Sequence, residues 1–136
     1  MLVMLFFAFY SLLSYAPVNN FIYIAESKGI KDTMINYYSS LIEALFKLES
    51  NRNIYAYNKS ENAVGGLQIR QCRIEHYNKL TGKNYTLNDM YDFEKSKEVF
   101  LYFAKGKTYE QAAKSWNGSG PKTIKYWDAI KVLLYA

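Results

Sequence analysis

The first clear pattern in the chain is an apolar repeat over residues 32–49. Apolar positions recur there at intervals of three and four residues, with no glycine or proline among them. These positions are Met34, Tyr38, Leu41, Ile42, Leu45 and Leu48. Because this spacing places apolar side chains on one face of an α-helix, we predict an amphipathic helix over residues 32–49.

The segment that follows loses this periodicity. Residues 51–62 are polar and turn-like apart from a short apolar stretch at 54–57, and residues 64–69 contain two adjacent glycines. Short runs bounded by turn-forming residues are typical of short strands or loops. We therefore expect one small β element in this part of the chain.

Capping signals divide the remainder into helices. Gly82 follows a predicted helix over about residues 71–80, and Asp92 is in position to cap the next one. Capping-box sequences begin at Thr86 and Thr108. The buried face of the helix after Asp92 is predicted to carry Phe93, Phe100 and Phe103.

Residues 117–121 separate the last two predicted helices. The first of these contains Trp116, and Pro121 suits the first turn of the second. The inward positions of the last helix are predicted to be Ile124, Trp127, Ile130 and Leu134. The chain is therefore expected to be mainly α, of the α+β class, with a small β element.

The first 25 residues differ from the rest because they carry no charge. An apolar run over residues 2–13 is followed by Ser14, Tyr15 and Ala16 and then by Pro17. This resembles a signal-peptide core with a small-x-small cleavage site, although no basic residue precedes it. The run is too short to span a bilayer comfortably. We treat residues 1–25 as a separate hydrophobic segment (export signal, membrane tether or packing helix) and residues 26–136 as the folded domain.

Composition narrows the function classes. The chain has 136 residues, half of them apolar, which fits one folded domain. Its net charge of +5 is spread along the chain rather than gathered in a block, so we expect no nucleic-acid partner. One cysteine, Cys72, and one histidine, His76, exclude a disulfide framework and multi-Cys or His-rich metal sites. We expect Cys72 to act as a small apolar side chain, and we expect no metal ion or organic cofactor.

Glu49 is the most informative polar residue. Helical spacing from Ile42 and Leu45 puts it at the edge of the apolar face, in the last turn before the glycine-bearing segment. Partial burial would raise the pKa of this carboxyl and suit it to act as a general acid near neutral pH. The alternative is a glutamate that simply ends a helix in solvent.

Four segments together resemble, in order and approximate spacing, the lytic transglycosylases and goose-type lysozymes. They are Glu49 with Ser50, residues 63–69, residues 112–121 and a last helix bearing Tyr126. In that family a helix ends in Glu-Ser, a Gly-Leu-Met-Gln-Ile stretch follows, and an Ala-Tyr-Asn-Ala-Gly-x-Gly segment precedes a tyrosine-bearing helix. The resemblance covers about residues 41–134.

The resemblance implies a role for each matching residue. Glu49 is similar to the catalytic acid, and the implied substrate-binding residues are Ser50, Gln68, Trp116, Asn117 and Tyr126. The chain departs from the pattern where Gly66 and Leu67 replace Leu and Met, where Trp116 replaces Tyr, and where Gly118 replaces Ala.

The implied fold is lysozyme-like, with the β element lining a cleft, and the implied activity is cleavage of the β-1,4 bond between N-acetylmuramic acid and N-acetylglucosamine in peptidoglycan. A lytic transglycosylase uses its glutamate as acid and then as base to close a 1,6-anhydro ring. The alternatives are a hydrolytic lysozyme with a second carboxylate such as Glu61, and an inactive glycan-binding or structural protein. We expect a monomer that is exported to the periplasm or cell wall, or that is carried on a virion if the source is a bacteriophage.

Overall fold

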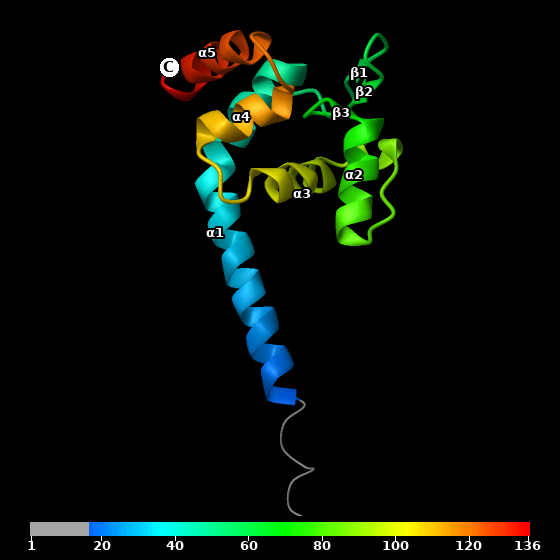
Figure 1. The fold of residues 1–136 in the computed structure, drawn as a ribbon, viewed down its shortest axis with the longest axis vertical. Coiled ribbons are helices and arrows are strands. Elements are labelled where there is room, and N and C mark those ends of the chain that lie inside the picture. Colours follow the sequence, from blue (N-terminus) through cyan, green and yellow to red (C-terminus); the bar gives the residue numbers. More distant parts are fainter. Residues whose placement is uncertain (1–16) are drawn as a thin grey trace, which may run out of the picture. The chain divides into compact units, whose positions relative to one another are not determined.

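The computed structural model describes the backbone of residues 17–136 and the side chains from residue 28 onward (Figure 1). The apolar run at 2–13 and the expected cleavage site at Ser14 to Ala16 lie outside the described residues. The chain divides into two units, Met1–Thr33 and Met34–Ala136. In the first unit the described backbone is helical. No helix in the described part of the chain is long and apolar enough to cross a membrane.

The first helix, α1, spans Pro17–Ser50 and so begins earlier than the predicted start at residue 32. Gly29 is its one internal glycine, and a single glycine weakens a helix by only about 1 kcal/mol relative to alanine. The predicted apolar face holds for Tyr38, Leu41, Ile42 and Leu45, which are all buried. Leu48 is exposed, contrary to the prediction, because it lies beyond Phe46, the last residue of α1 that packs in or against the core.

The small β element is a three-stranded antiparallel sheet in the order β1-β2-β3. Its strands are β1 (Tyr57–Asn58), β2 (Ala63–Val64) and β3 (Ile69–Arg70). Tyr57 pairs with Val64, and Val64 pairs with Ile69. The mainly helical α+β architecture expected from the sequence is therefore confirmed.

The remaining helices begin and end close to the predicted capping residues. They are α2 (Gln71–Thr81), the 3₁₀ helix η1 (Leu87–Tyr91), α3 (Phe93–Ala104), α4 (Tyr109–Asn117) and α5 (Lys122–Leu134). Gly82 ends α2 in a left-handed conformation, and the Asp92 side chain accepts hydrogen bonds from the first backbone N–H groups of α3. Thr86 and Thr108 both form the predicted capping boxes. These caps are local, which is why the sequence revealed them.

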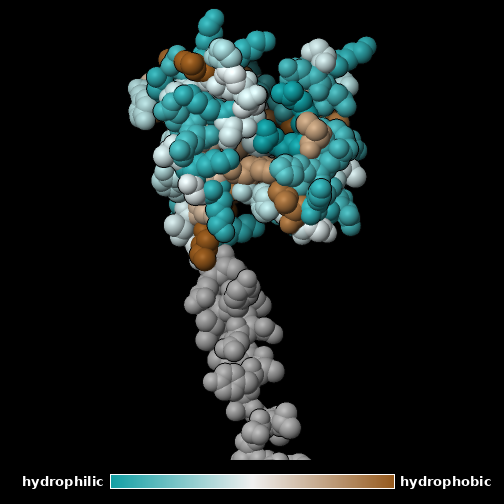
Figure 2. All heavy atoms as spheres, viewed as in Figure 1, coloured by the Kyte–Doolittle hydropathy of each residue, from teal (hydrophilic) through white to brown (hydrophobic). Residues whose placement is uncertain are grey.

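Within the unit Met34–Ala136, α3 lies between α2 on one side and α4 on the other (Figure 1). The buried core draws on all of these helices and on the sheet, and its largest fully buried side chains include Tyr77, Phe100 and Leu41. On the face shown in Figure 2, hydrophobic positions are scattered among hydrophilic ones.

The inward face of α5 matches the prediction at Ile130, which is buried, and at Trp127 and Leu134, which pack against the core, but not at Ile124. Ile124 is 56% exposed, whereas Thr123 and Ile130 are buried. Thr123 and Ile130 are seven residues apart, about two helical turns, so they share a face that Ile124 does not. The buried face of α5 thus begins at Thr123, and a search for apolar residues does not find a buried threonine.

A paired glycine substitution tests how the β2–β3 loop is packed. Gly65 and Gly82 both have positive φ, but a Cβ on Gly65 would lie 2.0 Å from the carbonyl oxygen of Met90, whereas a Cβ on Gly82 would meet nothing within 4 Å. We expect Gly65→Ala to lower the free energy of unfolding by about 1–3 kcal/mol more than Gly82→Ala, since only the former adds a steric clash to the backbone strain. Urea denaturation measures both. Equal losses would show that the clash is relieved without penalty.

Candidate active site

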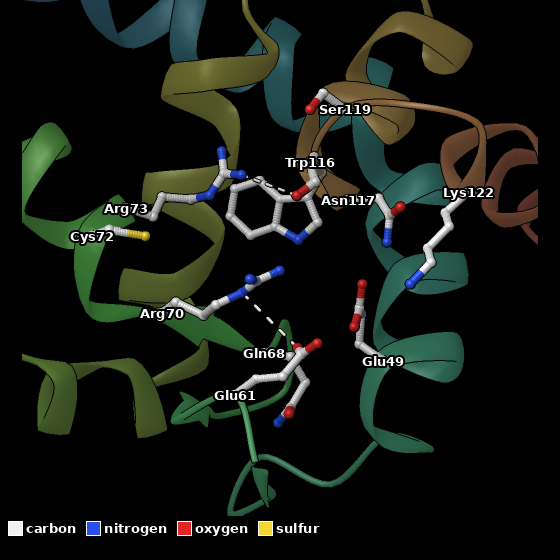
Figure 3. Close-up of a pocket in the computed structure, with 11 residues that line it drawn as sticks. Glu49, Glu61, Gln68, Arg70, Cys72, Arg73, Trp116, Asn117, Ser119 and Lys122 are labelled. Atoms are coloured by element: carbon white, nitrogen blue, oxygen red, sulfur yellow. Dashed lines mark hydrogen bonds and ion pairs between the residues drawn. The ribbon is translucent and has the colours of Figure 1, made fainter. Parts of the chain in front are cut away.

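A cavity of about 370 Å³ opens beside the last turn of α1 (Figure 3). This volume lies within the usual range of small-molecule sites, about 300–1,000 Å³. The cavity draws its lining from α1, the sheet with its turns, α2, the end of α4, the start of α5 and the connection between these two helices. The lining residues are Glu49, Glu61, Gln68, Arg70, Cys72, Arg73, Trp116, Asn117, Gly118, Ser119 and Lys122.

Glu49 is the partly buried acid of this pocket. The hydroxyl of Tyr126, from α5, donates a hydrogen bond to Oε1 of Glu49. Burial raises the pKa of the Glu49 carboxyl and outweighs the Tyr126 hydrogen bond, which lowers it; nearby Glu61 adds to the rise and Arg70 opposes it. Burial and the neighbouring carboxylate likewise raise the pKa of Tyr126, so this phenol stays protonated as a donor. Glu49 therefore keeps its proton to a higher pH than an exposed glutamate does.

The glycine pair brings the β2–β3 loop against α1 near Glu49. A Cβ on Gly66 would lie 2.6 Å from Cε2 of Phe46, so only glycine lets the loop lie this close to the helix. Phe46 in turn packs against Phe93, with 4.2 Å between the ring centroids. A glycine at position 66 thus has a packing reason in this chain.

Gln68 lines the pocket from a left-handed backbone conformation, with φ of 51°. Its Nε2 donates to the carbonyl oxygen of Gly65 at 2.9 Å and to that of Ala56 at 3.4 Å. The amide nitrogen therefore holds the loop together. Within the described chain the Oε1 atom has no such bond, which leaves it as the acceptor that Gln68 offers to a ligand.

Trp116 and Arg73 form one wall of the pocket. Trp116 is buried, and its indole Nε1 donates to the carbonyl oxygen of Leu67 at 3.3 Å, which ties α4 to the β2–β3 loop. The Arg73 guanidinium lies 4.3 Å from the centre of the Trp116 ring and donates to the Trp116 carbonyl oxygen at 2.9 Å. Sequence reasoning missed Arg73, because its partners are backbone and ring atoms 43 residues away, which leave no local pattern.

Glu61 lies on the opposite part of the lining, in the turn between β1 and β2. Its Oε2 is 3.9 Å from Nε of Arg70, and both side chains are about half exposed. An exposed pair at this distance adds little to stability. The structure therefore brings both sequence-predicted carboxylates, Glu49 and Glu61, to the same cavity, the first partly buried and the second exposed.

Of the other residues predicted to bind substrate, Asn117 reaches the pocket, and Tyr126 and Ser50 do not line it. Asn117, the last residue of α4, lines the pocket with Trp116, whereas Tyr126 supports Glu49 without lining the pocket itself. Ser50 is not brought to the lining. Its hydroxyl donates to the carbonyl oxygen of Phe46 and accepts from the backbone N–H of Asn53, so it closes the end of α1.

Cys72 corrects a prediction, because it is exposed and lines the pocket instead of packing as a small apolar side chain. It lies two residues from the buried Ile74 on α2, and such positions point to nearly opposite sides of a helix. Among the described residues, no three His, Cys, Asp or Glu side chains gather as metal ligands would.

No protein-family model, curated protein or solved structure matches this chain. The pocket itself supplies a carboxyl of raised pKa, an exposed carboxylate, amide groups and cationic side chains. Carboxyl groups in contrasting environments that face one cavity are suited to acid–base chemistry on a polar ligand.

Proposed function

We propose that this chain is a lysozyme-like enzyme that cleaves the β-1,4 bond between N-acetylmuramic acid and N-acetylglucosamine in peptidoglycan. The observation that carries the proposal is the partly buried Glu49 carboxyl, bonded to Tyr126 and lying in a pocket with Gln68 and Asn117. These are residues that the motif resemblance implicates, and they come from separate segments of the chain. The proposed enzyme acts as a monomer on the cell wall, after export or as part of a virion.

The first chemical step needs a proton donor at the bridging glycosidic oxygen. Glu49 suits this role because its raised pKa keeps a proton available to a higher pH than that of an exposed glutamate. As the C1–O4 bond breaks, the proton moves to the leaving O4 and Glu49 becomes a carboxylate. The Tyr126 hydroxyl, already directed at Oε1, stabilises this charged form.

The second step distinguishes a transglycosylase from a hydrolase. In the transglycosylase, the Glu49 carboxylate takes the proton of the muramyl 6-hydroxyl while O6 bonds to C1, which closes a 1,6-anhydro ring without consuming water. The acetamide of the substrate assists at C1 in some glycosidases. Asn117 and the free Oε1 of Gln68 are polar groups able to hold such an acetamide.

Hydrolysis is the second candidate mechanism, because Glu61 lines the same pocket. In an inverting hydrolase a second carboxylate activates a water molecule on the face opposite the acid. Glu61 is the nearest equivalent in this chain. We favour the transglycosylase because Glu61 lies in an exposed turn and pairs only loosely with Arg70.

Replacing the proposed acid tests the activity. Glu49→Gln keeps the size of the side chain and an oxygen acceptor for Tyr126 but removes the proton donor, so cleavage should fall by roughly 10²- to 10⁴-fold or more. Release of soluble sugars from purified peptidoglycan measures this loss. The matched control is Glu43→Gln on the same helix, an exposed residue paired with Arg52, which should leave cleavage unchanged.

Near-wild-type cleavage by Glu49→Gln would refute the assignment of the acid. A wild-type protein that binds peptidoglycan without releasing sugars would instead identify an inactive glycan-binding protein.

The products decide between the two mechanisms. We expect fragments ending in 1,6-anhydromuramic acid, which are one water lighter than hydrolysis products and are not reduced by borohydride. Mass spectrometry before and after borohydride treatment detects both properties. Glu61→Gln should then slow cleavage by less than about tenfold, which is under about 1.4 kcal/mol of barrier.

Reducible ends, together with a loss in Glu61→Gln as large as that in Glu49→Gln, would establish a hydrolase. Glu75→Gln, an exposed glutamate on α2 that does not line the pocket, controls for the loss of a surface charge.

A further inference from the structure

The lining of the pocket carries more cations than its acid–base chemistry uses. Arg70, Arg73 and Lys122 face the same cavity as Glu49 and Glu61. The raised pKa of Glu49 also means that this carboxyl is neutral over a wider pH range than an ordinary glutamate. The cavity is therefore biased toward positive charge.

Arg73 is already occupied by the protein. Its guanidinium donates to the carbonyl oxygen of Trp116 and stacks on the Trp116 ring. The guanidinium carbon also lies 5.4 Å from the centre of the Phe103 ring. Arg73 therefore acts as a positioning residue for the pocket wall and is not a free cation.

Lys122 differs from the other cations of the pocket. It is the first residue of α5, and Figure 3 shows its ammonium group directed into the cavity on the side of Glu49. Within the described residues, the Lys122 ammonium makes neither a hydrogen bond nor an ion pair. By contrast, Lys131 of the same helix is paired with Asp128 at 2.9 Å. An exposed, unpaired ammonium inside a pocket is free to bind an anion.

Arg70 approaches the cavity from β3, and Figure 3 shows its guanidinium pointing toward the same space. Its ion pair with Glu61 engages only Nε, at 3.9 Å. No hydrogen bond holds its two Nη atoms within the described chain. These atoms are the part of the guanidinium that forms paired hydrogen bonds to a carboxylate.

We propose that Lys122 and Arg70 bind carboxylate groups of the glycan, so that the pocket selects a carboxylate-bearing strand over a neutral one. This inference rests on the proposed function, since it names the feature of the strand that the same pocket recognises. Two sources of carboxylate exist on peptidoglycan, namely the lactyl group of muramic acid and the attached peptide. A polymer of N-acetylglucosamine alone has neither.

Binding measurements test this selection separately from cleavage. Glu49→Gln protein, which should not degrade its ligands, is titrated calorimetrically with three glycans: a neutral N-acetylglucosamine oligomer, a peptide-free peptidoglycan strand with free lactyl groups, and a peptide-bearing strand whose lactyl groups are amide-linked. Adding Lys122→Gln should weaken binding of at least one anionic strand by roughly tenfold, as expected for loss of a charge-assisted hydrogen bond. Binding of the neutral oligomer should not change.

Three further variants make the result specific to charge in the pocket. Lys125→Gln removes an exposed lysine from the same helix but outside the lining, and it should leave all three affinities unchanged. Lys122→Arg keeps the charge and should restore most of the lost affinity. Arg70→Gln should act in the same direction as Lys122→Gln. The affinity for the anionic strands should also fall with added salt, as for any exposed ion pair.

Each outcome supports or overturns the inference. A loss confined to the peptide-free strand identifies the lactyl carboxylate, and a loss confined to the peptide-bearing strand identifies the peptide. Equal losses for neutral and anionic glycans, no loss, or no binding of any glycan would overturn it. Cleavage by the wild-type protein with unchanged selectivity in Lys122→Gln would refute this inference alone. Selective binding without cleavage would refute the enzyme proposal and leave the selectivity standing.

Discussion

The hydrogen bond from Tyr126 to Glu49 is the interaction on which the rest of the site depends. A carboxyl taken out of water loses much of its hydration, and a buried polar group without a partner is destabilising. The Tyr126 hydroxyl supplies that partner from a helix that lies 77 residues further along the chain. The same bond joins the end of α1 to α5, the helix that also carries Lys122. The Tyr126 hydrogen bond therefore influences both the position of the Glu49 carboxyl and its pKa, and it links this carboxyl to the helix that carries Lys122.

Contacts behind the pocket hold its other walls. Gly65 and Gly66 let the β2–β3 loop pack directly on η1 and α1, and Trp116 bonds to the backbone of that loop. Arg73 then binds the carbonyl oxygen of Trp116, at the negative end of the α4 dipole. The β2–β3 loop, the end of α4 and the Arg73 guanidinium are thus joined in series, because Trp116 bonds to the loop and Arg73 bonds to Trp116.

The sequence revealed features that depend on short-range interactions and missed features that depend on long-range ones. The caps at Asp92 and Thr108 depend on residues within three positions, so their sequence signals were sufficient. The edge position of Glu49 followed from helical periodicity. The exposure of Leu48 and of Ile124 and the pocket-facing side of Cys72 depend on what packs against each helix, which periodicity does not encode. Arg73 and the amide nitrogen of Gln68 bind backbone oxygens. Every residue has a backbone oxygen, so such a partner leaves no signal in the sequence.

Direct titration of the Glu49 carboxyl by carbon-13 NMR tests whether burial keeps this acid protonated to a higher pH than an ordinary glutamate. We expect an apparent pKa above the ordinary glutamate value of about 4.3, with Glu43 on the exposed face of α1 as an internal comparison. Since the Tyr126 hydrogen bond favours the carboxylate, Tyr126→Phe should move the pKa of Glu49 further upward. A Glu49 pKa at or below about 4.3 in the wild-type protein would show that burial does not hold the proton on this carboxyl, and the assignment of Glu49 as the proton donor would lose its physical basis.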